Sequence, residues 1–455
     1  MKVFFTVPAI SYITDKPPIM QDLGLGYLAA IVRKQGHTVS IRDWNMDMAS
    51  ERYAEAVREA SPDVVCMKVF TKDVGAAVRT IETVRAECPS AKIVVGGPHP
   101  SAVQPEEVFE DLNGIDYSIR GEGEAGLPLL LNYISSGVEN GSGNLLSGIP
   151  GLVWKENGRV RGNPVKLDDV GNYGLPAWDL LNPAGYPPIK GLEPLETQGY
   201  SAPFITSRGC PGVCSFCSVK MISGVKVRRK PLGMIMDELS MLYSDYNVRS
   251  LMIMDNGFLV DEEFVQEMCA SMIDKGFNFK WDCVLIDIGR VLKEKTVEMM
   301  KKAGCVMVNL GVESGSERVR ASIKKLNSLE TVTDTVRLFR KYDIDLFGFF
   351  MLGFPAETRK EMQESIRLAK TLDFRMVSFT ICYPIPGTKV YEFIRDKYKI
   401  KRIDWKTFNI HESPYPCSEL KSSELSRLAR AKNLEFMVRK NPKMLYRKIL
   451  NRFSK

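Results

Sequence analysis

The most informative residues of this 455-residue chain are three cysteines in the run SRGCPGVCSFCS. Cys210, Cys214 and Cys217 stand in the spacing C-x3-C-x2-C. Three thiolates so close together can hold three irons of a cubane 4Fe-4S cluster and leave the fourth iron without a protein ligand. A substrate or a second cofactor could coordinate that open iron. The cluster would then be a reagent and not only an electron carrier.

Buried structural thiols and a zinc site are the other interpretations of these cysteines. Structural zinc takes four ligands with paired spacing, and no second cysteine pair or nearby histidine accompanies the run. Isolated cysteines elsewhere in the chain are more often small buried hydrophobes than ligands. Two of them, Cys283 and Cys382, fall on expected strands and could face a cavity, so a catalytic role for them stays open.

The cysteine run resembles the signature of radical S-adenosylmethionine (radical SAM) enzymes, and Phe216 between the last two cysteines also matches that pattern. The resemblance implies that the open iron chelates the amino and carboxylate groups of S-adenosylmethionine. It further implies that one electron from the cluster cleaves the sulfonium and releases a 5′-deoxyadenosyl radical. An electron donor such as flavodoxin or ferredoxin is then an expected partner.

The loop must be carried by the region 201–398, whose alternating strand and helix patterns predict a partial (β/α)6 barrel. Residues just after each of its six expected strands would rim one opening, where active sites of such barrels lie. By resemblance, Asp255 and Asn256 occupy the place of residues that contact the methionine amino group. Further candidate contacts to S-adenosylmethionine are Glu313, Ser314, Gly353 and Pro355. The alternative for each is loop architecture, because Asp caps helices, Gly turns the chain and Pro ends strands.

Residues 1–148 alternate β-branched runs with helical stretches. This rhythm predicts an α/β fold with a doubly wound, Rossmann-like parallel sheet, and ligands bind at the carboxyl ends of such strands. Two glycine-rich segments follow expected strands: VVGGPHPS, which contains Gly96, Gly97 and His99, and RGEGE, which contains Gly121 and Glu122. A third segment, LGLGYLAA, lacks the last glycine of a dinucleotide-binding fingerprint.

GGPHPS followed downstream by GEGE resembles the cobalamin-binding domain found ahead of radical SAM barrels in the class B methylase group. The resemblance implies a corrinoid that rests on the loops after strands one, three and four. The motif Asp-x-His-x-x-Gly, whose histidine ligates cobalt in other corrinoid domains, is absent, and the histidines here are His37, His99 and His411. In this group a cobalt without a protein imidazole below it is expected.

Two connecting regions complete the predicted organisation. Residues 149–200 are expected to form a β-hairpin, turning at Asn157-Gly158, and a linker rich in Pro, Gly and Asn. Residues 399–455 are expected to form a helical extension with a basic tail. The tail carries seven Lys/Arg and no Asp or Glu from Val438 to Lys455, which accounts for the net charge of +7. It could lie on an anionic membrane surface or form a solvated helix packed on the barrel.

The composition, with 44% hydrophobic and 26% charged residues, is typical of a soluble globular protein. No apolar run is long enough to span a bilayer, and the N-terminus lacks the features of a signal peptide. We therefore expect a cytoplasmic protein, with membrane contact through the basic tail as an option. Nucleic acid is not an expected partner, because the body of the chain has no basic stripe with interleaved aromatics.

Together the two resemblances imply an anaerobic, cobalamin-dependent radical SAM methyltransferase. It would methylate an unactivated carbon of a small metabolite such as a lipid, a tetrapyrrole or another natural product. The alternative is a cyclase or oxidoreductase of the tetrapyrrole ring-cyclase type, without net methyl transfer. A methylthiotransferase is disfavoured, because its first domain would carry three further cluster cysteines, whereas residues 1–150 contain Cys66 and Cys88. A non-enzymatic cobalamin-binding module would leave the clustered thiols without a purpose.

Overall fold

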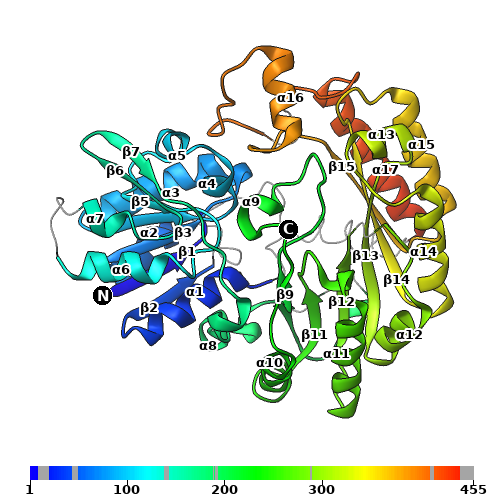
Figure 1. Ribbon diagram of the computed structural model, residues 1–455, viewed down its shortest axis with the longest axis horizontal. Coiled ribbons are helices and arrows are strands. Elements are labelled where there is room, and N and C mark those ends of the chain that lie inside the picture. Colours follow the sequence, from blue (N-terminus) through cyan, green and yellow to red (C-terminus); the bar gives the residue numbers. More distant parts are fainter. Residues whose placement is uncertain are drawn as a thin grey trace.

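The computed structural model describes residues 1–8, 20–43, 50–137, 143–187, 189, 193–286, 289–409 and 415–440. Two α/β regions lie side by side, and the cluster loop with its short helix α9 (Val219–Ser223) sits between them (Figure 1). The predicted fold class is confirmed. His411 and the part of the basic tail beyond residue 440 lie outside the described residues.

The first region is built on a seven-stranded sheet in the order β2-β1-β3-β4-β5-β6-β7. Its first five strands pair in parallel. They are β1 (Lys2–Thr6), β2 (Thr38–Arg42), β3 (Val64–Lys68), β4 (Lys92–Gly96) and β5 (Tyr117–Ile119). β1 and β3 are apolar and almost wholly buried, as expected of strands covered by helices on both faces.

The predicted hairpin extends this sheet beyond the expected boundary at residue 148. It consists of β6 (Leu152–Glu156), which pairs antiparallel with β5, and β7 (Arg159–Gly162), which pairs antiparallel with β6. The turn falls at Asn157 and Gly158, whose φ values of 50° and 76° lie in the left-handed region that a tight hairpin turn requires.

Helices cover both faces of the first sheet (Figure 1). They are α1 (Leu23–Lys34), α2 (Ser50–Ala60), α3 (Val74–Glu87), α4 (Pro98–Ala102), α5 (Pro105–Asp111), α6 (Leu127–Ser135) and α7 (Gly143–Leu146). The short helices α4 and α5 were not predicted. Each begins with a proline, which is tolerated in the first helical turn because its missing N–H would have no partner there.

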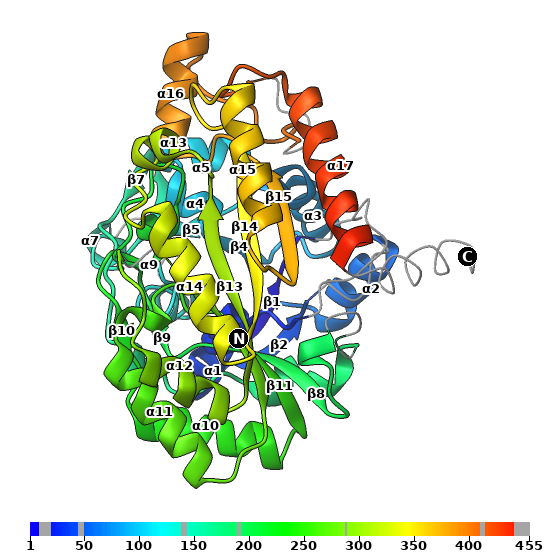
Figure 2. The ribbon, with the colours of Figure 1, turned by 90° about the vertical axis from the view of Figure 1, so that its right-hand side faces the viewer.

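The second region is an open half-barrel of six parallel strands in the order β15-β14-β13-β12-β11-β8, which confirms the six predicted strands. The strands are β8 (Tyr200–Phe204), β11 (Val248–Ile253), β12 (Lys280–Leu285), β13 (Cys305–Glu313), β14 (Asp345–Leu352) and β15 (Met376–Ile381). Its helices lie on the outer side of the curled sheet (Figure 2). They are α10 (Leu232–Ser244), α11 (Glu262–Asp274), α12 (Glu294–Lys302), α13 (Glu317–Ser322), α14 (Leu329–Lys341) and α15 (Arg359–Thr371).

The segment between the two sheets packs on both of them. It contains the helix α8 (Trp178–Leu181) and the short turn η4 (Glu193–Leu195). Trp178 is buried and donates its indole N–H to Glu238 of α10 at 3.0 Å. Leu195 packs with Met252 and Met307, which are residues of β11 and β13. The linker therefore covers part of the half-barrel sheet at β11 and β13.

Two helices, α16 (Lys389–Tyr398) and α17 (Ser422–Lys440), follow the last strand of the half-barrel. The second of them, α17, closes the free edge of the half-barrel. The Asn433 side chain accepts a hydrogen bond from the Phe379 N–H at 2.7 Å and donates to the Phe379 carbonyl at 2.9 Å. It thus satisfies the backbone of edge strand β15 as a neighbouring strand would. None of the helices that the structure describes has both the length and the apolar character needed to cross a bilayer.

Candidate active site

The three predicted ligands lie on a loop with a two-stranded stem. The stem strands β9 (Ser207–Arg208) and β10 (Arg228–Arg229) pair antiparallel. Gly209 begins the loop with φ of 98°, and a Cβ there would lie 2.1 Å from the Lys226 carbonyl oxygen. Only glycine fits such an approach. A Cβ on Gly212 would lie 3.3 Å from Cys210 Sγ and 3.8 Å from Cys214 Sγ, so both thiols face the same point.

The donor set of this loop fits a cubane cluster. Burial raises the pKa of the Cys210 and Cys217 thiols, and the neighbouring thiols add to that shift. Soft thiolates are the ligands of iron–sulfur clusters, and each binds a different iron. The three thiols are therefore not expected to converge on one ion. Among the described residues, no group of three or more Cys, His, Asp or Glu side chains has the geometry to hold a single metal ion.

The barrel anchors the cluster loop at several points. The Ser215 N–H donates to the Ile323 carbonyl at 3.1 Å, and the Ser215 carbonyl accepts from the Val390 N–H at 3.3 Å. Phe216 packs against Phe354, with ring centroids 5.4 Å apart. The aromatic residue of the cysteine motif thus connects the cluster loop to the glycine-rich loop after β14.

Asp255 and Asn256, at the end of β11, lie in different environments. Asp255 is 1% exposed, and its carboxylate accepts hydrogen bonds from Thr206 N–H, Thr206 Oγ1 and Ser207 Oγ at 2.6–2.7 Å. These contacts hold the corner between β8 and the stem. Asn256 instead lines the cavity described below.

Glu313 and Ser314 end the longest strand of the half-barrel. Glu313 has φ of 66°, which costs energy for a residue other than glycine and is typical of functional sites. Its carboxylate lies 3.5 Å from the ammonium of the buried Lys325. Ser314 is fully buried, and its hydroxyl lies 3.3 Å from the hydroxyl of Ser365. Glu313 therefore stands at the rim, whereas Ser314 holds the loop from beneath.

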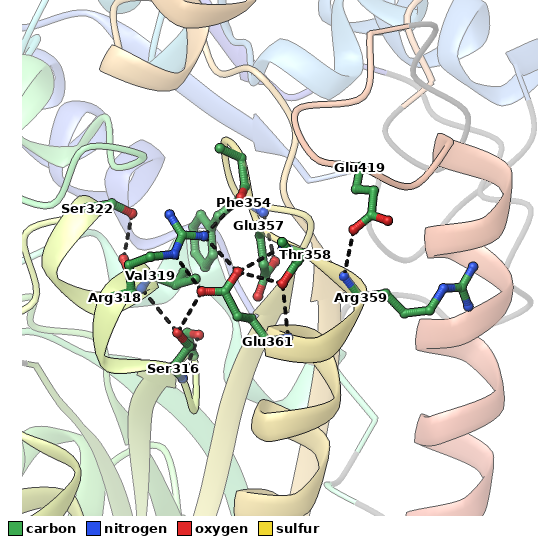
Figure 3. Close-up of polar contacts among 12 residues, drawn as sticks. Ser316, Arg318, Val319, Ser322, Phe354, Glu357, Thr358, Arg359, Glu361 and Glu419 are labelled. Atoms are coloured by element: carbon green, nitrogen blue, oxygen red, sulfur yellow. Dashed lines mark hydrogen bonds and ion pairs between the residues drawn. The ribbon is translucent and has the colours of Figure 1, made fainter.

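Two glutamates that were not predicted hold the rim loops: Glu361 connects the loops after β13 and β14, and Glu357 holds the loop after β14 (Figure 3). Glu361 accepts from Arg318 Nε at 2.6 Å and Ser316 Oγ at 3.0 Å, and the hydrogen bond from Arg318 lowers its pKa to about 2. Glu357 is buried and accepts from the N–H groups of Gly353 and Phe354 at 2.6 and 3.0 Å. Burial raises its pKa to about 7.

The position of Glu357 bears on the Gly353–Pro355 loop. Gly353 has φ of 89°, and a Cβ there would lie 2.7 Å from a Leu425 methyl carbon. Its N–H is occupied by the Glu357 carboxylate. Pro355 is half-buried next to these groups. The loop is thus held in a fixed shape by one side chain, and the left-handed φ of Gly353 favours glycine there.

A cavity of about 430 Å³ lies between the two regions. Its walls come from the carboxyl ends of β1, β3, β4 and β5, the start of α1, the stem of the cluster loop and the end of β11. Four predicted residues of the first region line it, namely Gly96, Gly97, Gly121 and Glu122. Gly97 has φ of 97°, and a Cβ there would lie 2.9 Å from Lys68 Cγ. The backbone thus comes close to the cavity, as a flat macrocycle requires.

The cavity wall is mostly apolar, with a few charged groups. Its ionisable lining residues include Asp22 and Lys68, whose carboxylate and ammonium lie 2.9 Å apart. Largely apolar walls with a few placed polar groups are typical of cofactor sites, so the residues present fit a corrinoid.

The remaining predicted residue, His99, is placed away from this cavity wall. It is fully buried, with Nε2 3.2 Å from Asp111 Oδ2 and Nδ1 3.3 Å from Thr71 Oγ1. The Trp405 ring packs edge-on against it. The structure therefore gives His99 a role in packing the C-terminal segment onto the first region.

Comparisons with known proteins agree with this geometry. Residues 204–369 match the radical SAM superfamily, and residues 13–131 match the B12 binding domain. A protein of Pyrococcus horikoshii, named an uncharacterised methyltransferase, is 30% identical over 463 residues, which cover 99% of this chain and 95% of that protein. The anaerobic magnesium-protoporphyrin IX monomethyl ester cyclase of Cereibacter sphaeroides is 26% identical, over 85% of this chain and 62% of that enzyme.

Solved structures show the same fold. The radical S-adenosylmethionine methyltransferase TsrM from Kitasatospora setae superposes with a TM-score of 0.69 at 18% identity, over 89% of this chain and 78% of TsrM. The chain belongs to the cobalamin-dependent radical SAM methyltransferase family. It is a radical SAM enzyme whose cofactors are a 4Fe-4S cluster, S-adenosylmethionine and cobalamin.

Proposed function

We propose that this enzyme methylates an unactivated carbon of an apolar small molecule. The observation that carries the proposal is the shared cavity. Gly96 and Gly97 of the cobalamin-binding edge, and Arg208 and Asn256 beside the cluster loop, line one space. When bound, the cluster with S-adenosylmethionine supplies a hydrogen-abstracting radical, and methylcobalamin supplies a methyl group. A substrate carbon in this space would be within reach of both.

The inner face of the half-barrel supports an apolar substrate. Strand pairing places Met252 and Met307 on either side of Asp282, where Leu195 of the linker covers both methionines. Phe347 and Phe349 stack with centroids 4.4 Å apart, and both are half-buried. Met254, which is 45% exposed, also lines the cavity. This combination of thioether and aromatic side chains suits a hydrocarbon or a flat ring system.

One polar pair interrupts the apolar face. Asn309 donates to Asp282 Oδ2 at 2.8 Å, and burial raises the pKa of Asp282 to about 6. A carboxyl group in an apolar wall can bond one polar group of a substrate and so orient it. We propose that Asp282 and Asn309 perform this orientation. A largely apolar lipid or tetrapyrrole with a polar substituent would meet these requirements.

The test uses the purified chain under anaerobic conditions, loaded with iron, sulfide and cobalamin. It is supplied with a reductant and with S-adenosylmethionine that carries a trideuterated methyl group. Isoprenoid lipids and tetrapyrroles are screened by mass spectrometry. Methyl transfer predicts a product heavier by one trideuteromethyl group in place of hydrogen. Formation of 5′-deoxyadenosine with an oxidised or cyclised product of unchanged carbon count would refute the proposed methyl transfer.

Cyclisation or oxidation without methyl transfer is the second candidate function. It is favoured by the 26% identity to the magnesium-protoporphyrin cyclase over 85% of this chain. The same assay separates the two reactions, because only the first places the deuterium label in the product.

A further inference from the structure

The stem of the cluster loop makes ionic contacts with the cobalamin-binding region. Arg208 on β9 and Arg228 on β10 are direct partners in the antiparallel pair. Directly opposite residues in such a pair project from the same face. The stem thus presents two guanidinium groups to one side. Glu122 and Glu124, which follow β5 of the first region, lie on that side.

Arg208 contacts both glutamates, with Glu124 the nearer, and Arg228 contacts Glu122; Arg208 Nη1 lies 3.7 Å from Glu122 Oε2. Arg208 Nη2 lies 2.6 Å from Glu124 Oε1. Arg228 binds both oxygens of Glu122, at 2.6 and 2.9 Å. The Tyr173 hydroxyl also donates to Glu122, at 3.0 Å. The Arg208 guanidinium lies 5.1 Å from the ring centres of both Tyr27 and Tyr173, so aromatic faces restrict it as well.

These ion pairs are buried, and their burial determines how they affect stability and geometry. Side-chain exposure is 13% for Arg208, 3% for Glu124, 10% for Arg228 and 2% for Glu122. Desolvation offsets much of the attraction in a buried pair, so such pairs add little net stability when both partners are present. Removing one partner leaves an uncompensated charge, so the bonded geometry is strongly preferred over a shifted one.

We propose that the Arg208–Glu124 and Arg228–Glu122 pairs set the position of the cluster loop relative to the cobalamin cavity. Arg208 stands two residues before Cys210, and the stem transmits its position to the cysteines. Glu122, Glu124 and Arg208 all line the cavity. The four residues are positioning residues. The inference depends on the cofactors of the family and not on the identity of the substrate or on the net reaction.

The first test follows loop mobility in the chain before cofactors are loaded. Hydrogen exchange of residues 209–226 is compared in wild type, Arg208→Met, Glu124→Gln and the double variant. Each single variant should raise exchange in the loop by roughly tenfold or more, because a buried charge loses its nearest partner. The double variant should exchange less than the sum of the two effects predicts, since the residues act as a pair.

The second test measures the geometry of the two cofactors. In the loaded protein, the reduced cluster and cob(II)alamin are both paramagnetic, and their mutual dipolar interaction reports the distance between them. Arg208→Met and Glu124→Gln should change or broaden this interaction while iron and cobalamin contents stay near wild type. Arg208→Lys retains the charge and is the variant of choice if Arg208→Met does not fold. It should show a smaller change in the same direction.

An exposed ion pair provides the control. Arg33 of α1 pairs with Asp179 of α8, and their side chains are 46% and 53% exposed. Arg33→Gln should leave loop exchange and the dipolar interaction as in wild type. The proposal is overturned if Glu124→Gln and Arg208→Lys lower the melting temperature while the interaction between the two cofactors stays unchanged. That outcome would assign the pairs to stability alone.

Discussion

The cluster loop and the cobalamin cavity are built in opposite ways. The loop concentrates its chemistry in three cysteines within one short motif, and glycine fits its first turn. The cavity draws its lining from two regions of the chain, and most of its members are apolar or backbone groups. This difference shows that a site whose ligands bind a metal cluster directly depends on a few side chains. A site for a large organic cofactor depends instead on the placement of many elements.

Replacing one cluster ligand should have the largest effect. Cys214→Ala should abolish S-adenosylmethionine cleavage and lower iron and sulfide content severely, because two thiolates cannot hold the cubane in place. Cobalamin binding should be retained, since no cluster cysteine lines the cavity. Iron and sulfide quantitation with 5′-deoxyadenosine analysis checks this.

The matched control is Cys283→Ala, because Cys283 is a fully buried thiol of β12 that packs against the outer helices. The Cys283→Ala protein should keep the iron content of the wild type. A Cys214→Ala protein with full iron content and activity would contradict the assignment of the ligands.

A change in the cavity backbone should have a graded effect. Gly97→Ala combines a φ of 97° with a Cβ only 2.9 Å from Lys68 Cγ. We expect cobalamin affinity to fall roughly tenfold and stability by about 1–3 kcal/mol, because the loop must shift. An anaerobic cobalamin titration measures the affinity.

Gly36→Ala is the control that separates the effect of backbone strain from the effect of a changed cavity shape. Gly36 has a similar φ of 86°, and a Cβ there meets nothing within 4 Å. This variant should lose about 1 kcal/mol of stability and keep its cobalamin affinity. Equal losses of affinity in both variants would show that the Gly97 loop does not shape the cofactor site.

Asp282, which we propose orients the substrate, extends the comparison from the two cofactor sites to the substrate site. Burial raises its pKa to about 6, above the value of about 3.9 for an unfolded aspartate, so its ionisation destabilises the fold as pH rises from about 4 to 6. Asp282→Asn should therefore raise the free energy of unfolding at pH 7.5 by about 1–2 kcal/mol, with the gain vanishing near pH 4.

Denaturant unfolding at several pH values measures this difference. If the variant is more stable but loses methyl transfer, the carboxyl group serves the substrate. A variant that is less stable at neutral pH would show that Asp282 is a structural ion.

The smallest effect concerns the connection between the two rim loops. Glu361→Gln weakens the contacts with Arg318 and Ser316 (Figure 3). Arg318 is 54% exposed, so solvent screens the pair and we expect a loss of about 1 kcal/mol at neutral pH. The pKa of Glu361 is lowered to about 2, so its contribution is present above about pH 4.3 and is lost as pH falls toward 2. Unfolding curves of both proteins at pH 7 and pH 3 check this, and an equal difference at both would contradict it.

The same contrast explains how much of the molecule could be predicted from sequence. Cysteine spacing indicated the cluster loop, and the strand rhythm indicated both sheets, because these signals are local. The Arg208–Glu124 and Arg228–Glu122 pairs span 84 and 106 residues, and no local pattern connects them. His99 was expected near the cofactor because it follows two glycines. It lies beneath that loop, because α4 begins at Pro98 and turns the ring toward Asp111.

The central claim is that cluster and cobalamin face one another across a single cavity. Pulsed electron paramagnetic resonance of the wild-type chain tests it most directly, with both cofactors loaded anaerobically, the cluster reduced by one electron to its paramagnetic state and the cobalamin held as cob(II)alamin. We predict one equivalent of each cofactor and a resolved dipolar interaction between them. Two full-occupancy signals without mutual interaction would contradict the account.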